Sequence, residues 1–72
     1  MKYYANIGGN SNVISYAYGA TFITVQFSSG RPYTYSYDSA GKDNVEHMKT
    51  LADSGVGLNS FVNSNVRNSF EK

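Results

Sequence analysis

The chain has 72 residues and a mass of 7.9 kDa, which is enough for one small domain and no more. Hydrophobic residues make up 40% of it and aromatic residues 15%, a composition too apolar for a disordered tail. The formal net charge is +1 without any acidic or basic block, so no bulk electrostatic attraction to nucleic acid or membrane surfaces is encoded. The absence of cysteine excludes disulfides, thiolate metal sites and cysteine nucleophiles.

The apolar residues are not arranged as a membrane span or a secretion signal. No apolar run approaches the roughly 20 residues that a membrane-crossing helix needs. Residues 1–6 lack the apolar core of a signal peptide. We therefore expect a protein that does not enter the membrane and is located in the cytoplasm.

The N-terminal residues 1–11 contain Gly8-Gly9-Asn10 and show no clear periodicity. We expect them to form either a loosely ordered arm or, through residues 2–5, an additional edge strand. Residues 12–72 are predicted to form the single domain.

Three segments between Val13 and Tyr37 alternate apolar and polar residues with a period of two, as half-buried strands do. The residues expected on one face of each strand are Ile14, Tyr16 and Tyr18, then Ile23, Val25 and Phe27, then Tyr33, Tyr35 and Tyr37. Because short connections join the segments, the pattern predicts a three-stranded antiparallel β-meander. Such a sheet needs a covering layer on its apolar face to be stable.

The second half of the chain supplies that cover. Apolar residues recur at helical spacing at Val45, Met48, Leu51 and Ala52. Asp43 is the expected N-cap of this helix, and Gly55 suits the left-handed residue that follows its end. A second helix is predicted after Gly57, with Asn59 as its cap and with Leu58, Phe61, Val62 and Val66 on its apolar face. The predicted fold class is therefore α+β, a three-stranded meander followed by two helices packed on one face.

Four segments in chain order are similar to those of the KTSC domain family: residues 11–16 (SNVISY), 22–27 (FITVQF), 29–35 (SGRPYTY) and 57–67 (GLNSFVNSNVR). The resemblance spans residues 12 to about 70. It implies a β-meander followed by helices, in a module that occurs alone in bacteria and phages and at the C-terminus of some lysyl-tRNA synthetases. RNA binding has been suggested for the family because of the synthetase context. This chain departs from the family in its closing segment, where the basic residues are reduced to Arg67.

The candidate binding residues are Arg31, Tyr33, Tyr35 and Arg67. Tyrosines on one sheet face can stack on unpaired bases, and arginines can contact phosphates, so these four residues could bind RNA or another single-stranded nucleic acid. The alternative interpretation is that the tyrosine rings form the core beneath the helices.

Nothing in the sequence indicates catalysis or a cofactor. His47 is the only histidine, and no motif supplies the further ligands or the nucleophile that a metal site or a catalytic base would need. We therefore expect a small non-catalytic binding module that binds RNA weakly. The competing hypothesis is a protein-interaction or assembly module, binding a protein partner or forming a homo-oligomer, in which the tyrosines are purely structural.

Overall fold

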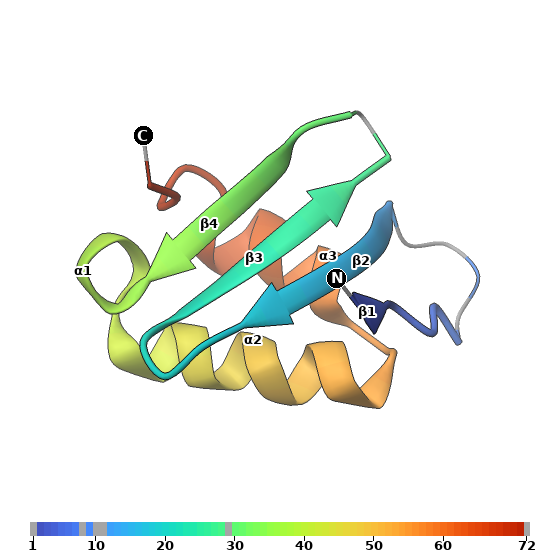
Figure 1. The fold of residues 1–72 in the computed structure, drawn as a ribbon, viewed down its shortest axis with the longest axis horizontal. Helices are drawn as coiled ribbons and strands as arrows, with labels where there is room; N and C mark the ends of the chain where they lie inside the picture. The colour runs from blue at the N-terminus through green and yellow to red at the C-terminus, as the bar shows by residue number, and fades with distance from the viewer. Residues whose placement is uncertain (1, 8, 10–11, 29, 72) are drawn as a thin grey trace.

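The computed structural model describes residues 2–7, 9, 12–28 and 30–71, and its fold is α+β. An antiparallel sheet in the order β1-β2-β3-β4 carries the helices on one of its faces (Figure 1). The strands are β1 (Lys2–Tyr3), β2 (Val13–Tyr18), β3 (Phe22–Phe27) and β4 (Pro32–Ser36). The helical elements are α1 (Tyr37–Ala40), α2 (Lys42–Ser54), α3 (Leu58–Phe61) and the π-helix η1 (Val62–Val66). The α+β class and the meander of β2, β3 and β4 are confirmed.

The expected number of three strands is wrong, because the described residues form four. Lys2 and Tyr3 pair antiparallel with β2, opposite Tyr16 and Ser15. The Tyr4 N–H continues the pairing by donating to the Ile14 carbonyl over 2.9 Å. Residues 2–4 therefore extend the edge of the sheet, while residues 1, 8, 10 and 11 of the predicted arm lie outside the described residues.

The face assignment expected for β2 is wrong at its beginning. The pairing register with β3 shifts between Val13 and Ser15, which marks a β-bulge. Val13 is therefore buried whereas Ile14 is 44% exposed, although the expected alternation placed Ile14 with the inward tyrosines. After the bulge Tyr16 is buried as expected.

The third meander strand ends one residue earlier than predicted. β4 stops at Ser36, and Tyr37 begins the short helix α1, which the sequence pattern did not reveal. Ser36 accepts a hydrogen bond from the Ser39 N–H, and the Ser39 hydroxyl accepts one from the Ser36 N–H, a reciprocal capping box.

Helix α2 is confirmed, with Val45, Met48 and Ala52 buried. Its start differs from the prediction: Gly41 is the N-cap, and Asp43 lies in the first turn. The end is as expected, because Gly55 has φ 77° and ψ 14° and its N–H donates to the Leu51 and Ala52 carbonyls.

The second predicted helix is present but is divided into α3 and η1. Gly57, in the left-handed conformation at φ 83°, precedes it, so Asn59 lies inside the helix and is not its cap. The widened π-turn covers Val62–Val66, where asparagine and serine are poor α-helix formers.

The core lies between the sheet and the helices, and the N-terminal segment closes one end of it. Tyr4 is buried, and its hydroxyl accepts a hydrogen bond from the Leu58 N–H over 3.3 Å. The Ile7 N–H donates to the Gly55 carbonyl over 2.9 Å. The most deeply buried side chains are Ile23, Val25, Tyr35, Val45, Met48, Leu58 and Val66. Within the described residues, no helix has the length and apolar character needed to cross a membrane.

Candidate binding hollow

A surface hollow of about 410 Å³ lies between the sheet and the C-terminal helical segment. Its lining residues come from β3, β4, α3, η1 and the segments that follow β3 and η1, together with one residue that precedes β2. They are Asn12, Phe27, Ser28, Tyr33, Tyr35, Asn59, Val62, Asn63, Arg67, Asn68 and Phe70. The hollow therefore joins two halves of the chain that are far apart in sequence.

Local structure determines which side chains reach the hollow. Tyr33 and Tyr35 alternate with Thr34 on β4, so both rings lie on the helix-facing side of the sheet. On the opposite wall, burial of Val62 and Val66 against the core fixes the rotation of η1 and leaves Asn63 exposed. Single π-turns are rare and occur frequently at functional sites.

The aromatic wall of the hollow is made by rings that pack on one another. The ring centroids of Tyr33 and Phe70 are 4.6 Å apart, with an interplanar angle of 57°. Phe27 approaches the Tyr33 ring at 5.9 Å and 59°. Tyr33 is half-buried and packs on both of these rings, which is closer to the core interpretation of the tyrosines than to an open stacking platform.

Tyr35 forms the floor of the hollow. Its side chain is 1% exposed, and its ring meets Phe70 edge-on at 6.3 Å between centroids. Desolvation by burial, followed by the neighbouring Tyr33, raises the pKa of Tyr35 to about 12. Tyr35 is thus a core residue that also borders the hollow.

The polar part of the lining combines one cation with neutral amides. Arg67 is exposed, and the amides belong to Asn12, Asn59, Asn63 and Asn68. No aspartate or glutamate occurs among the described lining residues. The site therefore suits a neutral or anionic ligand that offers several hydrogen-bonding groups.

Three of the four residues nominated from the sequence meet in this hollow. Tyr33, Tyr35 and Arg67 line it, whereas Arg31 is exposed immediately before β4 and is not part of the lining. Sequence reasoning missed the amides and Phe70. The available signal was the excess of asparagine between residues 59 and 68.

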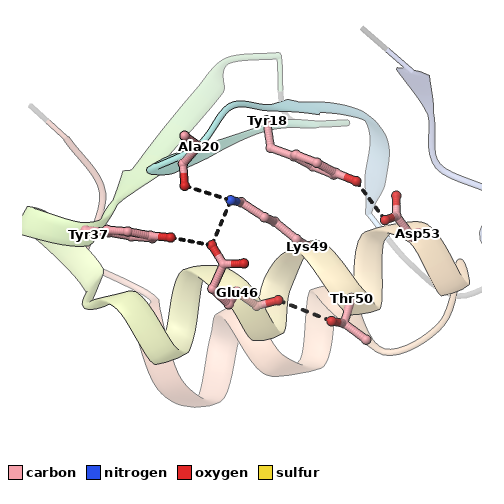
Figure 2. Close-up of polar contacts among 7 residues, drawn as sticks. All are labelled: Tyr18, Ala20, Tyr37, Glu46, Lys49, Thr50 and Asp53. Atoms are coloured by element: carbon pink, nitrogen blue, oxygen red, sulfur yellow. Dashed lines mark hydrogen bonds and ion pairs between the residues drawn. The ribbon is translucent and has the colours of Figure 1, made fainter.

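A second group of polar side chains joins α2 to the sheet (Figure 2). Lys49 Nζ donates to Glu46 Oε2 over 2.7 Å and to the Ala20 carbonyl over 3.2 Å, which links α2 to the β2–β3 turn. The Tyr37 hydroxyl also donates to Glu46 Oε2, over 2.6 Å. Hydrogen bonds from Lys49 and Tyr37 hold the pKa of Glu46 below its usual value. Because each group is partnered within the fold, we assign this network a structural role.

His47 does not belong to any cluster of catalytic or ligating groups in the part of the chain that the structure describes. Its ring packs on Phe61, with centroids 4.6 Å apart. No group of three or more histidine, cysteine, aspartate or glutamate residues that could hold a metal ion occurs among the described residues.

Comparisons of this chain with models of known protein families, with curated proteins and with solved structures found no match. The resemblance to KTSC domains accordingly stays a prediction.

Proposed function

We propose that this protein is a small non-catalytic binding module that takes a short stretch of single-stranded nucleic acid, in the first place RNA, at the hollow. One observation carries the proposal. The fold brings Tyr33 and Arg67 to a single hollow that also contains four asparagines and no described carboxylate. A site with this chemistry accepts a phosphate together with the hydrogen-bonding edges of a base.

The volume limits what the hollow can hold. At about 410 Å³ it lies within the roughly 300–1,000 Å³ that is usual for small-ligand sites, so it can accommodate about one nucleotide. In the proposed arrangement Arg67 contacts a phosphate and the asparagine amides contact a base edge. Tyr33 packs on Phe27 and Phe70, so in the proposed arrangement it contributes a polar hydroxyl and an apolar wall rather than an open stacking face.

The charge predicts weak binding. Arg67 is the sole cation in the described lining, and the net charge of the chain is +1. Exposed Arg31 lies before β4 and contributes at most long-range attraction. Affinity should therefore depend on fit within the hollow more than on bulk charge.

The test is an amide NMR titration with short single-stranded RNA and DNA at low salt. We expect shifts at Tyr33, Asn63, Arg67 and Asn68. Arg67→Gln should weaken binding about tenfold, corresponding to roughly 1.4 kcal/mol for a charged hydrogen bond. Lys42→Gln removes the same charge from the start of α2, outside the lining, and should leave the affinity nearly unchanged. Equal effects of the two variants, or shifts spread over the whole surface, would contradict the proposed site.

A specific observation favours a second candidate function, protein interaction. Tyr35 is 1% exposed and Tyr33 packs on Phe27 and Phe70, as expected if the tyrosines are purely structural. A titration without shifts, in a well-dispersed spectrum of the folded protein, would favour this second function over nucleic-acid binding.

A further inference from the structure

The segment that follows η1, residues 67–71, is called the tail below. It lies beside β4, the last strand of the sheet (Figure 1). The Glu71 N–H donates to the Thr34 carbonyl over 2.6 Å. The Thr24 and Thr34 hydroxyls are 2.8 Å apart, which is typical of a non-hydrogen-bonded strand pair, in which the backbone groups point away from the partner strand. Thr34 therefore presents its carbonyl to the outer edge, where the tail of the chain uses it.

Two side chains of the same segment, Phe70 and Glu71, contact residues of β4 on either side of this hydrogen bond. The Phe70 ring packs on Tyr33 at 4.6 Å and on Tyr35 at 6.3 Å between centroids. The Ser36 hydroxyl donates to the Glu71 carboxylate. Consecutive residues thus supply an aromatic anchor, a backbone hydrogen bond and an acidic anchor.

This combination is the chemistry by which sheet edges bind extended peptides: backbone bonds give affinity, and pockets for side chains give specificity. We infer that the edge of β4, with the Tyr33 and Tyr35 rings, is a docking site for an extended segment of a partner protein that carries an aromatic residue followed by an acidic residue. Phe70 and Glu71 occupy this site in the isolated chain. The inference rests on the second proposed function, protein interaction.

The exposure of residues 67–71 supports their exchange for a partner segment. Phe70 is only half-buried, and Arg67, Asn68 and Glu71 are exposed. Segments with few buried contacts open locally at a small fraction of the global unfolding free energy. Because the tail is covalently attached, its effective concentration is on the order of millimolar, so a peptide in solution competes poorly until the tail is weakened.

The test is an amide NMR titration of full-length variants with a capped peptide of residues 66–71. Phe70→Ala removes the intramolecular ring. Glu71→Pro leaves the core unaltered but removes both the N–H that donates to the Thr34 carbonyl and the carboxylate that accepts from Ser36. We expect the peptide to bind each variant at least tenfold more tightly than it binds the wild type, with shifts concentrated at residues 33–36. The Glu71→Pro variant keeps the test decisive if Phe70→Ala fails to fold.

A matched peptide with alanine in place of phenylalanine should not bind. Three results would overturn the inference: no shifts in the variants, equal binding of the two peptides, or equal affinity of the peptide for wild type and variants. Peptide shifts at the β1 edge instead of β4 would also overturn it. This titration contains no RNA, so its failure is distinguishable from a failure of the proposed nucleic-acid binding, which the RNA titration tests. It is also distinguishable from a failure of the proposed protein interaction, because a protein partner that lacks the aromatic–acidic pair would not depend on this site.

Discussion

The Tyr16 hydroxyl donates a hydrogen bond of 2.9 Å to Asp53 Oδ1 and so joins β2 to the last turn of α2. Tyr18, on the same strand, donates to Oδ2 of the same carboxylate over 2.8 Å. Hydrogen bonds from Tyr18 and Tyr16 hold the pKa of Asp53 below its usual value. Desolvation, followed by the Asp53 bond, raises the pKa of Tyr16 to about 12. One carboxylate therefore positions the end of α2 across β2.

This arrangement predicts acid sensitivity. A carboxyl whose pKa is lower in the folded than in the unfolded state stabilises the fold at pH values above its unfolded-state pKa. This contribution is lost as the pH falls through its folded-state pKa. We expect Asp53→Asn to reduce stability at pH 7 and to show a smaller further loss than the wild type between pH 5 and pH 2. Urea unfolding at these pH values measures the difference. Asp43→Asn is the control, because it removes a charge from the same helix without a tyrosine partner among the hydrogen bonds described; if it reproduces the effect, the assignment to Asp53 fails.

Tyr35 is predicted to be a core residue first and a site residue second. Its ring is almost fully buried, so Tyr35→Ala should cost about 3–5 kcal/mol and unfold much of the population of so small a domain. Tyr35→Phe keeps the ring and should remain folded, while removing one of the two phenols, Tyr16 and Tyr35, whose pKa is raised to about 12. Denaturant unfolding and absorbance titration measure these effects. An alanine variant with a stability close to wild type would show that the ring is not part of the core.

The spacing of apolar residues correctly predicted the elements that keep one face toward the core along their whole length. In β3, Ile23 and Val25 are fully buried as the period of two indicated, and α2 buries three residues of its predicted stripe while the fourth, Leu51, is half-buried. Gly55 ends α2 because the left-handed conformation required there is accessible to glycine at little cost. These features depend on residues adjacent in sequence.

What the sequence did not reveal depends on distant partners. The bulge before Ser15 is defined by pairing with β3, and no residue at the bulge signals it locally. Tyr4 is hydrogen-bonded to Leu58 and to the beginning of β2 and is buried there, although its neighbours in sequence look like an arm. Likewise, the hollow is formed by residues that only the tertiary fold brings together, such as Asn12 and Asn63. The chemistry of Tyr33 and Arg67 suggested binding, but the sequence pattern gave no information on the distance between them.

The contact of the N-terminal segment with Gly55 can be tested against a matched glycine. Gly55 and Gly57 have similar left-handed angles, with φ of 77° and 83°. A Cβ at Gly55 would lie 2.6 Å from the Ala5 Cβ, whereas at Gly57 the nearest atom would be 3.7 Å away. Both alanine variants should lose about 1 kcal/mol through backbone strain. Gly55→Ala should lose more, and hydrogen exchange at Ile7 should rise in that variant alone; equal losses would mean that the N-terminal segment does not pack on α2 in solution.

Salt dependence provides the sharpest prediction for the hollow. A single-stranded ligand that releases the counterion of one phosphate loses affinity with a log–log slope of about −0.7, which corresponds to about 2.6-fold between 50 and 200 mM salt. With Arg67 as the cation in the described lining, we expect the wild type to follow this shallow slope and Arg67→Gln to show almost none. Arg31→Gln removes an equal charge outside the lining and should retain the wild-type slope. Fluorescence anisotropy with a labelled RNA hexamer at several salt concentrations measures all three proteins. A much steeper wild-type slope that both substitutions reduce equally would assign binding to a diffuse basic surface instead of the hollow.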